Sequence, residues 1–131
     1  MPKYSLILSD NISTSTKISV HELCVDGESL FQIFIDKIIA DGNFKTELFG
    51  AIGNLELAAN LVRLPETKFR EIKAKGINVK LYEAKYRNIR IYHFQEKHTG
   101  RIIVCGGIKS NQTKDIKSAI NTIKNYHNER Q

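Results

Sequence analysis

The residues with the clearest chemical role are basic and aromatic side chains that alternate in the second half of the chain. Lysine and arginine hold a phosphate backbone, and aromatic rings stack on unpaired bases, as in many proteins that bind single-stranded RNA. The set comprises Lys73, Lys75, Lys80, Lys85, Arg87, Arg90, Arg101 and Lys109, interleaved with Tyr82, Tyr86, Tyr92 and Phe94. This combination favours contact with RNA.

The charge of the chain is distributed unevenly between its two halves. Residues 1–64 carry five basic and eight acidic side chains, whereas residues 65–131 carry fifteen basic and six acidic ones. The net charge is therefore −3 for the first part and +9 for the second. Clustered positive charge releases counterions from a nucleic-acid backbone, so the second part is the one expected to face a polyanion. A basic surface that serves only solubility gives the same signal, and charge alone does not separate the two.

Several other chemistries lack their sequence signals. The four histidines do not have the spacing of a zinc or iron site, and Cys24 and Cys105 lack the CxxC spacing, so we interpret the cysteines as buried thiols. There is no GxxxxGK[ST], GxGxxG or GxSxG motif. We therefore expect neither a metal nor a cofactor. The apolar stretches are short and interrupted by charges, which predicts a cytoplasmic protein without a membrane span or signal peptide.

The elements that position the basic residues follow from hydrophobic periodicity. Residues 4–8 and 17–25 read as strands. Ser29 and Gln32 have the spacing of a capping box, which begins a helix that ends at Asp41-Gly42. A second helix is predicted from Asn43 to Leu61, with a plausible break near Gly53-Asn54 because glycine disfavours helix. Residues 77–86, 88–95 and 101–105 predict an antiparallel meander whose last hairpin turns at residues 97–100, and residues 113–127 predict a final helix.

Helices segregated from a meander predict an α+β domain. We expect one domain over residues 1–131, with a strand extension (1–25), a helical pair (28–61), the meander (77–105) and a C-terminal helix (113–127). Alternation places Arg90 with Tyr92 and Phe94 on one face of its strand. From the pattern alone, Arg90 is either a phosphate contact or an ordinary exposed strand residue.

Four segments resemble the HigB-like, phage-derived branch of the RelE/ParE toxin superfamily. The run 80–94, KLYEAKYRNIRIYHF, resembles the "LYELR…YRILYFF" strand pair, and 100–104, GRIIV, resembles the third strand. The segment 107–112, GIKSNQ, is similar to the "GFxKKTxK" loop, and 116–126 is similar to the "EIxxAxxRxxEY" helix that follows it. The resemblance implies a RelE-like fold, namely an N-terminal strand or hairpin, two helices, a three-stranded antiparallel meander and a C-terminal helix.

The resemblance also implies an activity, that of the toxin of a type II toxin–antitoxin system. Such toxins are metal-independent endoribonucleases that cut mRNA on the ribosome, where a ribose 2′-hydroxyl attacks the adjacent phosphate. The reaction needs a base, an acid and cations for the charge that develops on the phosphorane.

Individual residues take roles by their match to the family motifs. Arg90 matches the arginine of "YRI" and would stabilise the phosphorane, and Lys109 matches the first lysine of the loop as a second catalytic residue. Lys75 falls where the family has basic residues before the meander and would act as a phosphate contact or base. The implied RNA-binding residues are Lys73, Lys80, Lys85, Tyr82, Tyr92 and Lys117.

The sequence departs from the family pattern in the loop, which keeps other functions open. Ser110 replaces the second loop lysine, Asp115 stands where many relatives have proline, and the loop contains no arginine. One alternative is a ParE-like inhibitor of DNA gyrase, and another is an inactive binding protein with the same fold. The partners implied are a cognate antitoxin and ribosome-bound mRNA, with no membrane. A homodimer and a toxin–antitoxin hetero-oligomer both remain open.

Overall fold

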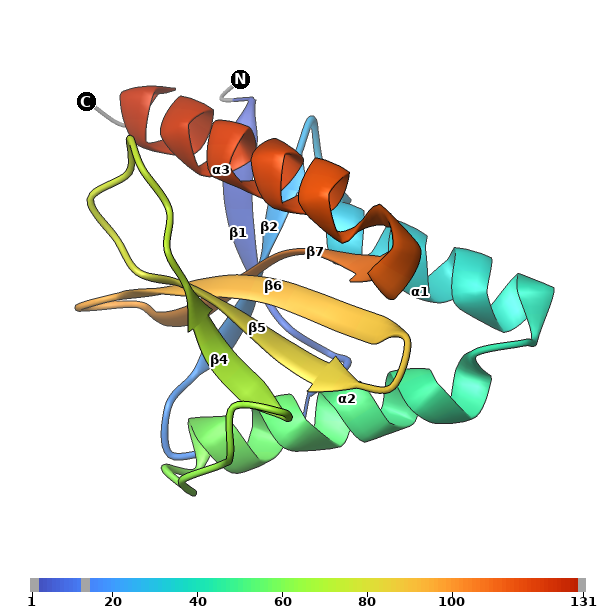
Figure 1. The fold of residues 1–131 in the computed structure, drawn as a ribbon. Helices are drawn as coiled ribbons and strands as arrows, with labels where there is room; N and C mark the ends of the chain where they lie inside the picture. Colours follow the sequence, from blue (N-terminus) through green and yellow to red (C-terminus); the bar gives the residue numbers. More distant parts are fainter. Residues whose placement is uncertain (1–2, 13–14, 130–131) are drawn as a thin grey trace.

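The computed structural model describes residues 3–12 and 15–129, and within them it has an α+β fold with three α-helices and a mixed seven-stranded sheet (Figure 1). The helices are α1 (Leu30–Asp41), α2 (Lys45–Ala59) and α3 (Gln112–Glu129), and a short 3-10 turn, η1 (Lys109–Asn111), precedes α3. The strands are β1 (Tyr4–Leu8), β2 (Val20–Val25), β3 (Glu28–Ser29), β4 (Phe69–Ile72), β5 (Leu81–Tyr86), β6 (Ile89–Glu96) and β7 (Gly100–Ile108). The expected α+β class is confirmed.

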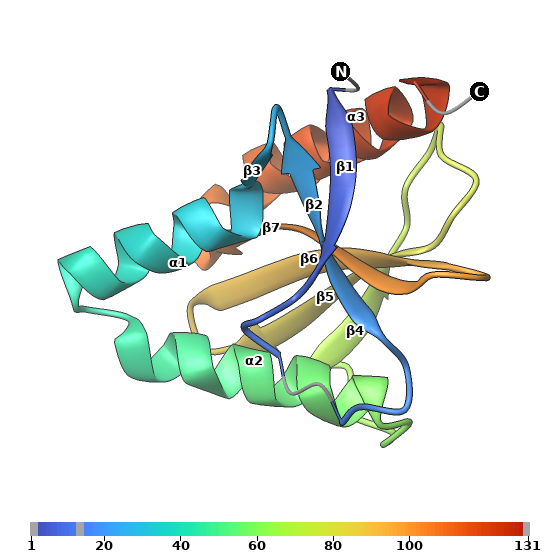
Figure 2. The ribbon, with the colours of Figure 1, turned by 180° about the vertical axis from the view of Figure 1, so that it is seen from behind.

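The sheet joins an N-terminal hairpin to an antiparallel meander through one parallel pair. The strand order is β1-β2-β7-β6-β5-β4, and β3 pairs with β2 off this path. Strand β2 runs parallel to β7, while the other paired strands are antiparallel. Helices α1 and α2 connect the hairpin to the meander, so they form the crossover between the two parts of the sheet (Figure 2).

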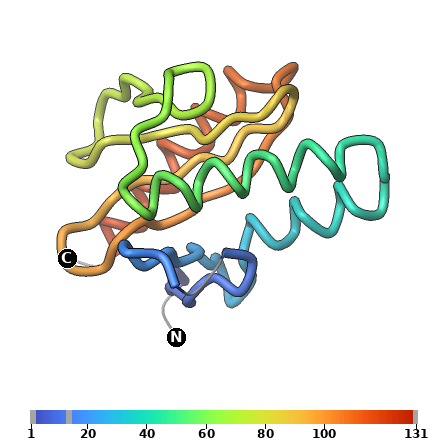
Figure 3. Tube along the Cα trace, turned by 90° about the horizontal axis from the view of Figure 1, so that it is seen from below, coloured from blue at the N-terminus to red at the C-terminus, as the bar shows by residue number. Residues whose placement is uncertain are grey.

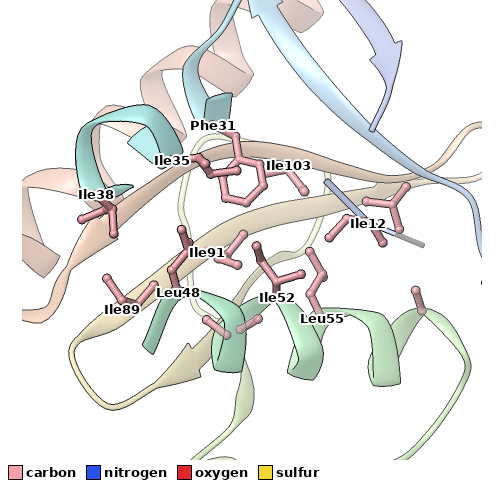
Figure 4. Packing of buried hydrophobic residues seen from close by; sticks show 14 residues of the cluster. Ile12, Phe31, Ile35, Ile38, Leu48, Ile52, Leu55, Ile89, Ile91 and Ile103 are labelled. Atoms are coloured by element: carbon pink, nitrogen blue, oxygen red, sulfur yellow. The ribbon is translucent and has the colours of Figure 1, made fainter. Parts of the chain in front are cut away.

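The helices cover the sheet from two sides. Helices α1 and α2 are joined by a short turn and run back alongside each other (Figure 3). Their apolar side chains meet the sheet in one core cluster, which is centred on Phe31, Leu48, Ile52, Leu55, Ile91 and Ile103 (Figure 4). Helix α3 packs on the opposite face through Ala119, Ile123 and Tyr126, against Tyr92 and Phe94 of β6.

A buried carboxylate fixes the start of α1 against the N-terminal hairpin. Glu22 of β2 is 1% exposed and accepts hydrogen bonds from the hydroxyls of Ser9 and Ser29, each at 2.6 Å, and from the amide of Asn11 at 2.8 Å. Ser29 is also the N-cap of α1, because its Oγ accepts from the backbone N–H of Gln32 at 3.0 Å. The predicted capping position is therefore confirmed.

The N-terminal strand is attached to the end of α3. The carboxylate of Glu129 accepts hydrogen bonds from the backbone N–H groups of Lys3 and Tyr4, at 2.8 and 2.9 Å. The ring of Tyr4 lies edge-on to that of Tyr126. The two described ends of the chain consequently lie close together (Figure 1).

The structure corrects four expectations about the elements. The predicted strand 77–86 begins only at Leu81, and the predicted strand 101–105 continues to Ile108. The meander has four strands rather than three, because Phe69–Ile72 forms an additional edge strand.

The fourth correction concerns α2, which is continuous through the glycines near which the sequence suggests a break. Tertiary packing explains this. The ring of Tyr86 lies so close to Gly50 that a Cβ there would be 2.5 Å from a ring carbon. The amide of Asn54 donates to the carbonyl of Lys85 at 2.6 Å, which ties the helix to β5. None of the helices in the described part of the chain combines the length and the apolar character of a membrane-spanning segment.

We expect Ser29→Ala to lower the free energy of unfolding by about 1–3 kcal/mol, because it removes both the helix cap and a hydrogen bond to a buried carboxylate. Urea denaturation would measure the change. Ser118→Ala, an exposed serine-to-alanine change in α3, is the matched control and should have little effect. Equal stability of the two variants would contradict the role assigned to Ser29.

Candidate functional site

The centre of the candidate site is a second buried carboxylate, that of Glu83 in β5. Its side chain is 0% exposed and receives polar groups from three elements. Arg70 Nε of β4 lies 2.5 Å from Oε1, and Lys85 Nζ of β5 lies 3.8 Å from the same oxygen. Gln112 Nε2, at the start of α3, donates to the two carboxylate oxygens at 3.0 and 3.2 Å. A buried negative charge is thus surrounded by donors, as its desolvation requires.

Arg90 of β6 adds a further positive charge next to Lys85 of β5. It pairs with Lys85 on β5 and with Gly107 on β7, so the three residues form one row. Its Nη1 donates to the carbonyls of Arg87 at 2.5 Å and Ile89 at 3.1 Å, which holds the guanidinium against the β5–β6 turn. Arg90 is buried, at 7% exposure, and its Nε has no hydrogen-bond partner among the described residues. Arg90 is therefore not an ordinary exposed strand residue.

The surroundings of Lys85 change its proton affinity. Burial lowers the pKa of Lys85 below its ordinary value of 10.5, and the positive charges of Arg70 and Arg90 lower it further, while Glu83 opposes the shift. At neutral pH, a larger fraction of this amine is neutral than for a free lysine. Among the basic residues around Glu83, Lys85 is therefore the one best suited to accept a proton.

The two tyrosines predicted to bind RNA occupy different environments. Tyr92 is fully buried in the core beneath α3, and burial raises the pKa of its hydroxyl. Its ring is consequently not available to stack on a base. Tyr82 is partly exposed but stacks on Phe69 and His93, with ring centroids 5.4 and 5.8 Å apart. Because side chains alternate along β5, Tyr82 lies on the opposite face of the sheet from Glu83.

The structure does not bring Lys73 and Lys75 to Arg90. Both lie exposed in the loop after β4, and the space beside Gly76 in that loop is occupied by the side chain of Lys124. Lys124 is twelve residues along α3 from Gln112, a separation of about 18 Å for an α-helix. Lys80 is also exposed and lies 4.0 Å from Glu71. These three lysines form a separate basic region near the far end of α3.

Lys109 and Lys117 lie exposed around the start of α3. The backbone N–H of Lys109 donates to the carbonyl of Asn88 at 2.7 Å, which places it beside the β5–β6 turn that also holds Arg90. A shallow groove of about 530 Å³ includes Lys109, Gln112, Lys114 and Lys117 in its lining. The exposed lysines thus border the cluster of Arg70, Glu83, Lys85, Arg90 and Gln112, which we call the Glu83 cluster.

Sequence reasoning missed Glu83, Arg70 and Gln112. A signal for Glu83 was present, because it alternates with Lys85 on the same face of an otherwise apolar strand. Arg70 carried no such signal, since β4 was not predicted. Among the described residues, no three His, Cys, Asp or Glu side chains are grouped so that they could hold a metal ion.

Comparison with known proteins identified no relative. No protein-family model matches the chain, and no curated protein and no solved structure matches it either.

We expect Glu83→Ala to lower the free energy of unfolding by about 3–5 kcal/mol, because it leaves the cations around it without their counter-charge. Chemical denaturation monitored by circular dichroism would measure this. Glu71→Ala removes an exposed glutamate from the neighbouring strand and should change stability by no more than about 0.5 kcal/mol. A loss for Glu83→Ala as small as that of the control would show that the Glu83 cluster does not stabilise the sheet.

Proposed function

We propose that this protein is the toxin of a type II toxin–antitoxin system and a ribosome-dependent mRNA endoribonuclease with a RelE-like fold. The observation that carries the proposal is the Glu83 cluster, in which a lysine of lowered pKa lies beside two arginines and is bordered by exposed lysines. Phosphodiester transfer by a 2′-hydroxyl needs such a combination of a base and fixed cations.

The arrangement of the elements supports the same proposal. A strand hairpin is followed by two helices, an antiparallel meander and a final helix, as the resemblance implies. The segments 80–94 and 100–104, which carry the strand resemblance, form most of β5, β6 and β7. Arg90 and Lys109, the two residues matched to the family's catalytic positions, both donate hydrogen bonds to carbonyls of the β5–β6 turn.

In the proposed reaction, the neutral amine of Lys85 removes the proton of the ribose 2′-hydroxyl. The 2′-oxygen then forms a bond to the adjacent phosphorus, and the bond from phosphorus to the 5′-oxygen breaks. Arg90 stabilises the additional negative charge of the phosphorane through its fixed guanidinium. The ammonium of Lys109 donates a proton to the departing 5′-oxygen. The products are a 2′,3′-cyclic phosphate and a 5′-hydroxyl.

The proposed partners follow from charge. The second half of the chain, with its net charge of +9, would bind ribosomal RNA and mRNA, and an acidic antitoxin would cover the same surface. Such an association should be fast and sensitive to salt.

The cleavage itself can be tested by mapping 5′ ends of cellular mRNA after induction of the protein in bacterial cells. We expect new cuts inside translated codons with the wild type, and none with Lys109→Ala, which changes an exposed residue and leaves the core intact. Arg90→Ala should also abolish cleavage, with circular dichroism used to verify its folding. Lys97→Ala, an exposed lysine in the β6–β7 turn, is the matched control and should cut like the wild type. Arrested growth with intact mRNA and inhibited gyrase would replace this proposal with the ParE-like one, and unhindered growth would indicate an inactive binding protein.

The cleavage rate in a reconstituted ribosome assay should rise with pH, because Lys85 must be neutral to act as the base. The rise should level off below pH 10.5, since the pKa of Lys85 is lowered from that value. Lys85→Met should reduce the rate by about 10²–10⁴-fold, the usual contribution of a general base. Lys97→Met, which changes an exposed lysine in the β6–β7 turn, serves as the control. A pH profile unchanged by Lys85→Met would exclude Lys85 as the base.

A further inference from the structure

Strand β1 forms the edge of the sheet on the side away from the Glu83 cluster, and no described strand pairs with its outer side (Figure 2). The other edge strand, β4, contains Arg70 and Glu71, and charged side chains in an edge strand oppose pairing with another chain. Strand β1, with the sequence YSLIL, contains no charged residue. Two of its side chains, Ile7 and Leu8, are 48% and 54% exposed. An apolar edge strand of this kind readily pairs with a further strand.

The hydrogen bonds to β2 show which backbone groups of β1 point outward. The N–H of Ser9 donates to the carbonyl of Val20 at 2.9 Å, and the N–H of Asp26 donates to the carbonyl of Lys3 at 2.7 Å. Hydrogen-bonded pairs alternate with non-hydrogen-bonded pairs along an antiparallel ladder, so the odd-numbered residues of β1 bond to β2. The even-numbered residues direct their N–H and C=O groups away from β2.

The outward edge of β1 is only partly occupied. The backbone N–H of Tyr4 donates to the carboxylate of Glu129 at 2.9 Å, so the end of α3 already binds the first outward donor. The N–H and C=O groups of Leu6 and Leu8 have no hydrogen-bond partner among the described residues. Each of these two residues carries one donor and one acceptor, and all of these groups are available to a neighbouring strand.

We propose that this edge pairs with the β1 strand of a second copy of the chain, antiparallel and about a two-fold axis at Ile7. In this register, Leu6 of each copy lies opposite Leu8 of the other. Both pairs are of the hydrogen-bonded kind, because these residues point their backbone groups outward, and the N–H of each donates to the C=O of the other. A two-fold axis at Leu6 would instead pair Tyr4 with Leu8, and the N–H of Tyr4 would have to leave Glu129.

The apolar side chains fit the same register. The non-hydrogen-bonded pair at the axis brings Ile7 against Ile7 of the second copy, and opposite residues approach most closely in pairs of this kind. On the other face of the sheet, the exposed Leu8 covers the partly buried Leu6 of the second copy. Both large apolar side chains that β1 exposes are thus removed from water.

Charges complement each other at the two ends of the contact. Because Ser9 continues the ladder with β2, Asp10 of one copy comes opposite Tyr4 of the other. The Nζ atom of Lys3 lies 5.8 Å from the centre of the Tyr4 ring, so each end brings an acidic group toward a basic one. The two Glu83 clusters stay apart, because β2, β7 and β6 lie between β1 and β5. The inference therefore does not rest on the proposed ribonuclease function.

Analytical ultracentrifugation over a range of concentrations tests the pairing. The contact is smaller than a standard protein interface, so we expect a reversible equilibrium between monomer and dimer. Ile7→Lys places two like charges opposite each other at the axis and should raise the dissociation constant about tenfold or more. Ile39→Lys, the same change at a residue of α1 with 45% exposure, is the matched control and should leave the constant unchanged. A chain that stays monomeric up to about 1 mM would overturn the proposal.

A pair of opposite charges locates the axis. Ile7→Asp alone should dimerise as weakly as Ile7→Lys, whereas an equimolar mixture of the two variants should form a heterodimer, because only the mixture places opposite charges at the axis. Hydrogen exchange followed by NMR gives an independent readout. The amides of Leu6 and Leu8 should exchange more slowly as the protein concentration rises, whereas the amide of Tyr4, bonded to Glu129, should not. A dimer that Ile7→Lys does not weaken, a mixture that stays monomeric, or slower exchange only at other amides would contradict pairing at β1.

Discussion

The burial of Glu83 is the constraint on which the meander side of the molecule depends. A carboxylate without exposure to water keeps its charge only if donors surround it, and here they come from β4, β5 and the start of α3. The edge strand, its neighbour and the helix above them are therefore held in one relative position. The same requirement places a positive charge on each side of the carboxylate, so the group that organises the sheet also concentrates the cations of the proposed active site.

The two faces of the sheet differ in how apolar and polar side chains are distributed over them. The face beneath α1 and α2 is filled mainly by an apolar cluster, and Glu22, His93 and Arg101 are among the polar residues buried on that face. The face beneath α3 is apolar only where the later turns of the helix pack, at Ala119, Ile123 and Tyr126. Toward the first turn of α3, polar groups replace the core. Helix α3 thus packs on the sheet through the apolar residues of its C-terminal part, and polar residues lie around its first turn.

The glycines at the end of β7 extend this polar region into a cleft. Without side chains at Gly106 and Gly107, the strand accommodates Phe34 from one helix and Asp115 from another. Asp115 stands where many members of the resembled family have proline. In the folded protein this aspartate is a partly buried carboxylate that accepts no hydrogen bond from the described residues, which is a chemical property that a proline does not have.

Most helices and strands could be predicted from the sequence because their signals are local. The capping residue Ser29, the apolar stripes of α1 and α3 and the β-branched runs of β6 and β7 depend on neighbours a few residues away. The basic character of the second half was equally visible. Two other features required the fold. Strand β4 is four residues long and exists because it pairs with β5, and α2 passes through its glycines because Tyr86 packs against Gly50.

The composition of the candidate site was likewise decided by tertiary structure. From the family motifs, the sequence assigned catalytic roles to Arg90, Lys109 and Lys75 and RNA binding to Lys73, Lys80 and Lys85. It could not show which of these six residues lie together in the folded protein. Pairing between β5 and β6 places Arg90 beside Lys85, and the packing of α3 places Gln112 beside Glu83. The loop that contains Lys75 lies near Lys124, toward the other end of α3. Residue types and their periodicity can be read directly from the sequence. Which charges become neighbours, and which of them lose water, depends on contacts between residues far apart in the chain.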